Sequence, residues 1–241
     1  MLYIVPTPVG NLGDMTPRAL EVLRMCSAIY AEDTRTSGVL MKHFGITTPL
    51  MSFHKFNEHE ALDAVAERLE TGEDIALISD AGTPGISDPG FLLARECRRK
   101  DIPVITLPGP TAFVPALVSS GLPCERFVFE GFLPPKKGRA TRIEEIAART
   151  MTSIIYESPL RLVKTLQQLS EACGPERQAS VSREISKLHE ETKRATLGEL
   201  VEYFLQNNPR GEIVIVLGGK EVVTRADSHK NKYRQTNEEE E

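Results

Sequence analysis

The stretch ISDAGTPGISDPG, residues 78–90, decides the fold class of this chain. The apolar run 75–78 leads into it, and the apolar run 91–94 continues beyond it. A short apolar run, then Gly and Pro, then an amphipathic run is typical of a strand, a loop and a helix. Ser87 or Asp88 is expected to cap that helix, with Pro89 in its first turn.

Asp80 is the first candidate for a binding role. In an open α/β sheet, ligands bind at the loops that follow the carboxyl ends of the strands. Asp80 comes directly after the buried strand and before the expected cap, so helix capping does not account for it. The sequence therefore predicts that Asp80 contacts a small polar ligand, whereas Asp88 is interpreted as part of a capped turn.

Composition limits the classes of protein. The chain has 241 residues, 40% of them hydrophobic and 26% charged, which is ordinary for one large or two small globular domains. No apolar run approaches the roughly 18 residues of a membrane span. Residues 1–6 have no basic leader and are interpreted as a first strand, so we expect a cytoplasmic protein. The net charge of −5 argues against a generally basic nucleic-acid binder and leaves room for a local patch.

No metal site is expected. The four cysteines are scattered without the spacing of a metal knuckle or a redox motif. His54 and His59 are the nearest histidine pair, and their spacing does not place two ligands on one helix face.

Apolar runs at residues 1–5, 28–31, 49–53 and 103–107 alternate with helical patterns, which predicts a mostly parallel α/β sheet. One of these helices should begin at Thr16 and Pro17. Arg35 is expected on a strand-to-helix loop, either as a salt-bridge partner for the preceding acids or as a ligand for phosphate or substrate. Thr111 is either a helix N-cap or a ligand contact.

The pattern changes after residues 121–123. We place a domain boundary near Ser119, which predicts an N-terminal α/β domain over residues 1–118 and a C-terminal α/β domain with a mixed sheet over residues 119–219. The polar residues 220–241 are predicted to be disordered. In the second domain, a Gly/Pro-rich loop follows the strand expected over residues 127–132 and carries four cations, either an RNA phosphate contact or a solvated surface. These cations are Lys136, Lys137, Arg139 and Arg142.

Several motifs occur together in order and identify a family. They are PVGNLGD (8–14), AEDTR (31–35), SDAGTP (79–84), SDPG (87–90), LPGPTA (107–112), FEGFLP (129–134), YESP (156–159) and REISK (183–187). Over residues 2–218 the chain resembles the RsmI family, 16S ribosomal RNA cytidine 2′-O-methyltransferases with the tetrapyrrole-methylase fold. It departs from the family at Ser186, usually Thr, and at Leu160, often His.

The resemblance implies S-adenosylmethionine bound in a cleft between two α/β domains of a homodimer, and 16S rRNA of the small ribosomal subunit as substrate. The positions that match the family's cofactor contacts are Asp80, Thr83, Ile86, Thr111 and Ala112, with Tyr156 and the segment ending in Ile213 closing the cleft.

Methyl transfer to a ribose hydroxyl needs a base or close positioning. Glu184 is the first candidate base, ahead of Glu190 and Glu157. Strand alternation would put Arg183 and Lys187 on one face, opposite Glu184, with Lys187 as a second catalytic candidate. The alternative for Glu184 is a structural ion pair.

Two other functions stay open at this point. One is a methyltransferase acting on tetrapyrroles or another small molecule, and the other is a non-catalytic ribosome-binding factor. The basic loop and the SDAGTP motif argue against the first. A methyl-transfer assay on small ribosomal subunits and on a tetrapyrrole would separate all three.

Overall fold

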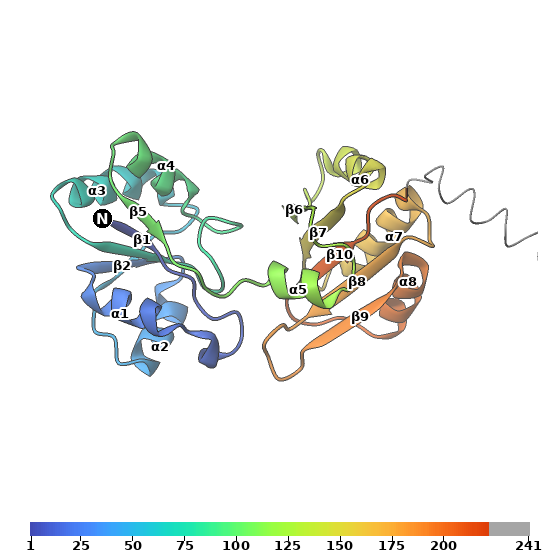
Figure 1. Ribbon diagram of the computed structural model, residues 1–241, viewed down its shortest axis with the longest axis horizontal. Helices are drawn as coiled ribbons and strands as arrows, with labels where there is room; N and C mark the ends of the chain where they lie inside the picture. The colour runs from blue at the N-terminus through green and yellow to red at the C-terminus, as the bar shows by residue number, and fades with distance from the viewer. Residues whose placement is uncertain (222–241) are drawn as a thin grey trace, which may run out of the picture. The chain divides into compact units, whose positions relative to one another are not determined.

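The structure is a computed structural model, and it describes residues 1–221. The tail predicted to be disordered, 220–241, lies outside the described residues from 222 onward. The chain forms two compact units (Figure 1). The first unit comprises Met1–Ser119, Ser182–Thr192 and Arg210–Val214; the second comprises Ser120–Val181, Lys193–Pro209 and the chain from Ile215.

The first unit is built on five parallel strands in the order β3-β2-β4-β1-β5, which confirms the predicted parallel sheet. Its elements are β1 (Leu2–Ile4), the 3₁₀ helix η1 (Leu12–Asp14), α1 (Pro17–Met25), β2 (Ala28–Ala31), α2 (Thr34–His43), β3 (Leu50–Ser52), α3 (Glu58–Glu70), β4 (Ile75–Ile78), α4 (Phe91–Arg99), β5 (Val104–Thr106) and α5 (Phe113–Ser119).

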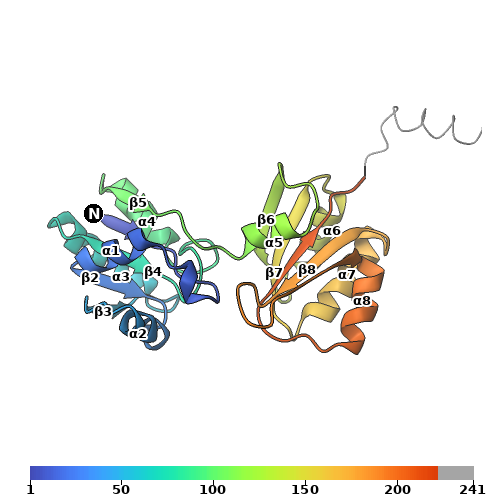
Figure 2. The same cartoon turned by 60° about the horizontal axis from the view of Figure 1, so that its bottom comes forward.

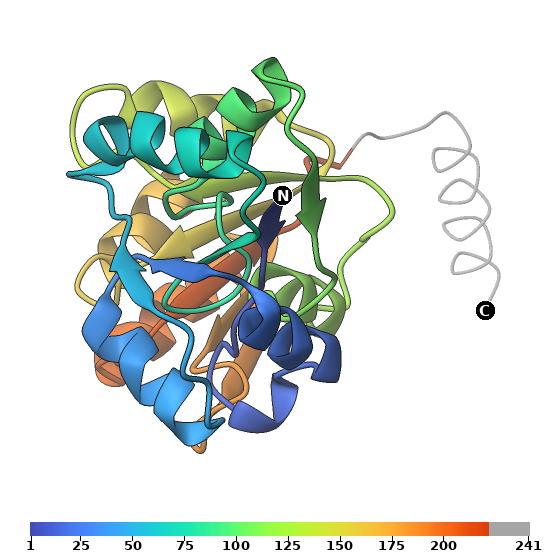
Figure 3. The same ribbon diagram turned by 90° about the vertical axis from the view of Figure 1, so that its left-hand side faces the viewer.

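Both faces of this sheet are covered. Ile75 and Leu77 of β4 are buried in a cluster with side chains of α3 and α4, whereas Ala76 and Ile78 are buried in a second cluster with α1 and α2. Successive residues of a strand point to opposite faces, so β4 contributes to both cores. Figure 3 shows α3 above the sheet and the blue helices α1 and α2 below it.

The connections that leave β1 and β4 diverge. These strands are neighbours in the sheet, yet the chain leaves β1 for α1 on one face and leaves β4 for α4 on the other. Such a divergence is a topological switch point, where the loops separate and ligands of α/β proteins bind. The stretch 78–90 is one of the two loops at that point.

Two predicted helix starts are wrong in detail. The N-cap of α4 is Gly90 at φ 135°, not Ser87 or Asp88, and its amide donates to Glu58 Oε1 at 3.1 Å. Gly is suited to this backbone conformation, which other residues rarely adopt. Arg35 was expected on a loop and instead lies in the first turn of α2. The helix begins at Thr34 because Asp33 is its N-cap, and the Asp33 side chain accepts the Arg35 amide.

The second sheet is mixed, as predicted, with the strand order β6-β7-β10-β8-β9. Its elements are β6 (Phe127–Phe132), α6 (Arg139–Ala148), β7 (Thr152–Glu157), α7 (Leu162–Cys173), β8 (Gln178–Arg183), β9 (Glu191–Thr196), α8 (Leu197–Gln206) and β10 (Ile213–Leu217). Figure 2 shows α7 and α8 on one face of this sheet. The strand β9 was not predicted, because this edge strand is polar and lacks the apolar run that marks the others.

No helix among residues 1–221 is long and apolar enough to span a membrane.

Candidate functional site

The loops that follow β1 and β4 are joined beyond the end of the sheet. Thr7 and Gly82 exchange two backbone hydrogen bonds, each of 2.9 Å, in an antiparallel bridge. The buried Thr7 hydroxyl also donates to the Ser79 carbonyl oxygen at 2.9 Å. The start of the 78–90 stretch is therefore held in place by the loop after β1.

A third loop, residues 107–112, joins them after β5. The Thr83 hydroxyl donates to the Pro110 carbonyl oxygen at 3.3 Å. Gly109 packs on Pro6, where a Cβ would lie 2.8 Å from the proline Cβ. The predicted cofactor contact Thr83 thus lies beside the segment that holds Thr111 and Ala112. We call the loops 5–11, 32–33, 79–90 and 107–112 the strand-end loops.

Carboxylates gather at these loops. The Asp33 amide donates to Asp80 Oδ1 at 3.2 Å, which links the loops after β2 and β4. Burial, followed by the charges of Asp88, Asp80 and Asp33, raises the pKa of Glu32 to about 7. Burial also raises the pKa of Asp80 and of Asp88, although the Ser79 hydroxyl donates to Asp88 and opposes the shift there.

Sequence reasoning missed two members of this acidic group, Glu32 and Asp88. Asp88 was interpreted as part of a capped turn, and the structure places it among the carboxylates instead. The signal for Glu32 was present, since it follows a strand of the same parallel sheet directly, as Asp80 does.

Arg35 is 89% exposed, and its Nη2 lies 2.6 Å from Asp33 Oδ2. Its geometry is that of the salt-bridge alternative.

The raised pKa of Glu32 predicts a pH-dependent stability. The unfolded chain releases this proton near pH 4.5 and the folded chain near pH 7, so folding becomes less favourable as the pH rises between these values. Glu32→Gln removes the cost of burying this charge and its repulsion by the nearby carboxylates. The substitution should raise the Tm at pH 8 by about 2–4 °C, after allowance for solvent screening, while changing it little at pH 5. Thermal unfolding at the two pH values measures this, with Glu60→Gln on the exposed face of α3 as control. An equal shift at both pH values would contradict the prediction.

Glu184 and Lys187 form a compact ion-pair group. Lys187 Nζ lies 2.9 Å from Glu184 Oε1 and 3.1 Å from Glu212 Oε2, and the Glu212 amide donates to Glu184 Oε1 at 3.1 Å. The bond from Lys187 is the main cause that lowers the pKa of Glu184. Burial opposes the charge on Lys187, but its two carboxylate partners outweigh burial and raise its pKa.

The predicted strand alternation of residues 183–187 is wrong. The strand β8 ends at Arg183, which pairs with Glu191 at 2.6 Å, and the chain then turns through Glu184 at φ 53° and Ser186 at φ 66°. Lys187 consequently contacts Glu184 directly rather than sharing a face with Arg183. Positive φ values in residues other than Gly are uncommon and are held here by surrounding contacts.

Those contacts come from the loop after β1, which belongs to the same unit as this turn. The Ser186 hydroxyl donates to Asp14 Oδ2 at 2.7 Å. Gly10 of the loop after β1 packs against Lys187 so closely that a Cβ would overlap the lysine side chain and lie 2.9 Å from the Ile185 carbonyl oxygen. The turn 184–190, which carries the catalytic candidates, is therefore fastened to a strand-end loop.

Comparison with known proteins shows the family of this chain. The family model for tetrapyrrole (corrin/porphyrin) methylases matches residues 1–201. The chain is 49% identical over 220 residues to ribosomal RNA small subunit methyltransferase I of Synechocystis sp., an alignment that covers 91% of this chain and 79% of that protein. It is 46% identical over 221 residues to the Escherichia coli O157:H7 protein of the same name, with 90% and 77% covered. The chain belongs to the ribosomal RNA small subunit methyltransferase I family, within the tetrapyrrole methylases.

Two solved structures of methyltransferases share the fold of this chain. The methyltransferase CobJ matches with a TM-score of 0.68 at 17% identity, covering 92% of this chain and 96% of its own. Cobalt precorrin-4 methyltransferase matches with a TM-score of 0.67 at 15% identity, covering 90% and 94%. At these identities the likeness shows the fold alone. The family predicted from the motifs is confirmed by the family model and by the two relatives described above.

In this member of the ribosomal RNA small subunit methyltransferase I family, fewer of the four predicted cations are available to RNA than expected. Lys136 and Lys137 are exposed and have no ion pair among residues 1–221. Arg142 is half exposed and lies 3.5 Å from Glu130 and 3.2 Å from Glu145. The prediction is wrong for Arg139, which is 7% exposed and whose guanidinium is directed into the second unit.

Arg139 lies close to a buried carboxylate, that of Glu157. Arg139 Nη2 donates to Thr165 at 2.6 Å and lies 3.8 Å from Glu157, whose carboxylate also accepts from Arg161 at 2.7 Å and from Thr165 at 2.6 Å. Glu157 is buried and its carboxylate is occupied by these partners, so its geometry is that of a structural acid. Glu190 is exposed and accepts the Ser186 amide at 2.9 Å, which closes the turn 184–190.

The remaining cofactor candidates differ in surroundings. Ile86 is half exposed on the 79–90 loop, whereas Ile213 is buried at the start of β10. Tyr156 lies on β7, where its ring meets Phe129 at 5.0 Å and Phe132 at 5.7 Å between centroids. Ile213 can offer a ligand its backbone but little side-chain surface.

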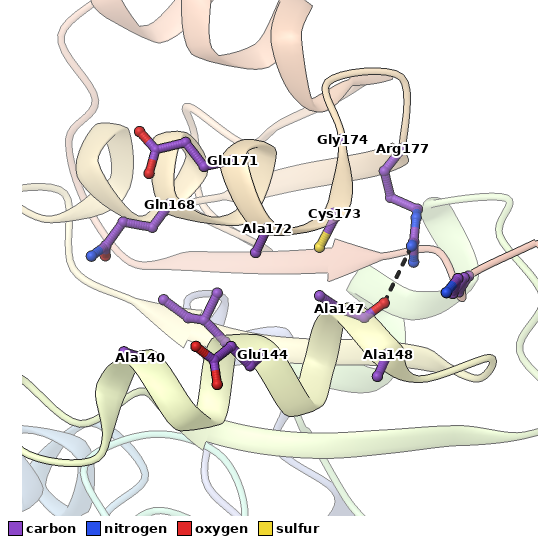
Figure 4. Close-up of a pocket in the computed structure, with 12 residues that line it drawn as sticks. Ala140, Glu144, Ala147, Ala148, Gln168, Glu171, Ala172, Cys173, Gly174 and Arg177 are labelled. Carbon is purple, nitrogen blue, oxygen red and sulfur yellow. Dashed lines mark hydrogen bonds between the residues drawn. The ribbon is translucent and has the colours of Figure 1, made fainter.

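A separate hollow of about 780 Å³ lies between α6 and α7 (Figure 4). Small side chains line much of it, and Arg177 at one end donates to the Ala147 carbonyl oxygen at 3.3 Å. None of the predicted site residues lines this hollow. Within residues 1–221, no cluster of three or more His, Cys, Asp or Glu side chains could hold a metal ion.

Proposed function

We propose that this protein transfers the methyl group of S-adenosylmethionine to the 2′-hydroxyl of a cytidine ribose in 16S rRNA of the small ribosomal subunit. The observation that carries the proposal is the 49% identity, over nine-tenths of the chain, to a protein named ribosomal RNA small subunit methyltransferase I. Such a substrate implies activity in the cytoplasm, and the family resemblance implies a homodimer.

The strand-end loops are the proposed site for the methyl donor. S-adenosylmethionine carries a sulfonium and an ammonium group, and the carboxylates at Glu32, Asp80 and Asp88 suit these positive charges. The donor has no phosphate, which agrees with loops that lack a Walker-type motif. We assign its contacts to the family-matched positions, which are Asp80, Thr83, Ile86, Thr111, Ala112, Tyr156 and the backbone at Ile213.

When bound, S-adenosylmethionine supplies an electrophilic methyl group, and the chain must bring a ribose hydroxyl in line with it. We assign this orientation to Glu184 and Lys187. The lowered pKa of Glu184 keeps it a carboxylate that accepts the hydroxyl hydrogen bond but is a weak base. The raised pKa of Lys187 keeps it an ammonium that suits a neighbouring phosphate and holds Glu184 in place.

Glu184→Gln should lower the single-turnover methylation rate by about 10²-fold, the low end of what a general base contributes, because the carboxylate is a weak base. The measurement uses saturating donor and subunits, and donor affinity should not change. Glu190→Gln, on the same turn, is the matched control. A loss below about tenfold would leave Glu184 as a structural ion-pair partner.

Lys136 and Lys137 are the proposed contact with RNA phosphates, with Arg142 contributing less because two acids share it. Replacing both lysines by alanine should reduce the slope of log binding constant against log salt by about 1.4–1.8, for two lost phosphate contacts. The control replaces the exposed Lys42 and Lys164 instead. An unchanged slope would make the loop a solvated surface.

The function itself is tested by incubating the protein with labelled S-adenosylmethionine and small ribosomal subunits that lack the modification. Nuclease digestion and mass spectrometry should find 2′-O-methylcytidine. Transfer to a tetrapyrrole such as uroporphyrinogen III instead would support the small-molecule alternative. Binding to subunits without transfer would support a non-catalytic ribosome-binding factor.

A further inference from the structure

A turn beside the strand-end loops presents an almost fully exposed aromatic ring. Phe56, in the turn 54–57 before α3, is 92% exposed. An isolated apolar side chain on a surface is ordinary, but a ring this exposed gains nothing from the core of its own fold. Its position must therefore be explained by the turn that carries it.

The side chains of the turn brace its backbone. His54 Nδ1 accepts the amides of Phe56 and Asn57, both at 3.2 Å. Asn57 Oδ1 accepts the His54 amide at 2.7 Å, and its Nδ2 donates to the Ser52 carbonyl oxygen at 3.3 Å. The Phe56 ring meets the edge of the His54 ring, with 6.0 Å between their centroids, and is otherwise presented to solvent by this braced turn.

This turn is tied to the proposed donor site. Glu58 Oε1 accepts the amide of Gly90, the last residue of the 79–90 loop, at 3.1 Å. Phe91, 61% exposed, follows directly, and the Arg95 guanidinium lies 5.4 Å from the centre of its ring. This hydrogen bond therefore links the two segments that carry the exposed rings, at the edge of the strand-end loops.

Cations accompany the two rings. Lys55 and Arg95 are exposed, and neither has an ion pair among the residues that the structure describes. Unpaired RNA bases stack on aromatic side chains while the backbone needs positive charge nearby. The core of an interface between two copies would instead be depleted of charged residues.

We propose that Phe56 and Phe91, with Lys55 and Arg95, form a stacking surface for unpaired bases of the RNA substrate. The inference rests on the proposed function and adds to it a binding surface in the first unit, separate from Lys136 and Lys137 of the second. Bases that flank the target nucleotide stack on the rings, and the two cations meet the adjoining phosphates.

The chain contains no tryptophan, so Phe56→Trp creates a single fluorescent reporter. Small ribosomal subunits or oligocytidylate should quench its emission as a base stacks on the indole. Leu205→Trp, an exposed position near the end of α8, is the matched reporter and should not respond. Equal responses from the two reporters, or none from Phe56→Trp, would overturn the proposal.

Kinetics test the same surface in the protein without a reporter. Phe56→Ala should raise the KM for small ribosomal subunits by about 5- to 150-fold, the loss expected for one stacked base, with donor affinity and Tm unchanged. Phe56→Tyr should restore the KM and Phe56→Leu should not. A KM that does not change, or full rescue by Leu, would overturn the stacking role.

Two further outcomes would also count against it. Sedimentation should find the same molecular mass for Phe56→Ala and the unaltered protein, and a change in mass would assign the ring to contact between copies. Methylation by the unaltered protein separates this test from that of the proposed function. Absence of any methylation there would reject the function, whereas normal methylation with an unaffected Phe56→Ala would reject this inference alone.

Discussion

Replacing Glu157 by glutamine should lower the free energy of unfolding by about 3–5 kcal/mol, the usual cost of breaking a buried charge pair from one side. The Glu157 side chain is fully buried, and its carboxylate accepts hydrogen bonds from Arg161 and Thr165 and from the Ser158 amide at 2.8 Å. The neutral amide would leave the nearly buried Arg139 without its nearest carboxylate.

Urea denaturation followed by circular dichroism measures the loss, and hydrogen exchange of the α7 amides shows whether it falls in the second unit. Glu145→Gln is the control, since Glu145 is half exposed and pairs with Arg142 at the surface. Surface pairs of this kind contribute about 0–1 kcal/mol. A loss below about 1 kcal/mol for Glu157→Gln would contradict the account of the buried network.

Asp80→Asn should weaken binding of S-adenosylmethionine by about 10- to 150-fold, the loss expected when one hydrogen bond to a charged group is removed from a binding site. Asp80 is exposed at the end of β4, and only Oδ1 is used by the Asp33 amide. The rest of the carboxylate can face a ligand. Because Asn can keep the bond from the Asp33 amide, the Tm of the protein without donor should change little.

Isothermal titration calorimetry with S-adenosylmethionine measures the affinity directly, with Asp63→Asn on the exposed face of α3 as control. An affinity for Asp80→Asn equal to that of the unaltered protein would remove Asp80 from the donor site. A lower Tm together with weaker binding would instead point to disruption of the Asp33–Asp80 link.

Local patterns determined much of the fold, because they depend on neighbours in the chain. The buried run 75–78 predicted β4, and Thr16 with Pro17 predicted the start of α1, where the Thr16 side chain accepts the Ala19 amide at 3.2 Å. Turn residues and hydrophobic period act within a few residues and can be read from the sequence. The polar edge strand β9 was not predicted because it has no such pattern.

The motifs in the sequence also identified the family and placed Asp80 at the end of a strand. Tertiary structure decided which charged residues pair. Arg139 and Lys137 are two positions apart, yet one is buried against Gln168 and Thr165 and the other is exposed. Glu184 accepts the amide of Glu212 and Lys187 pairs with the Glu212 carboxylate, although Glu212 lies 28 and 25 positions away from them along the chain. The partner of a charge depends on which distant segments the fold brings within hydrogen-bonding distance, and no local pattern records that.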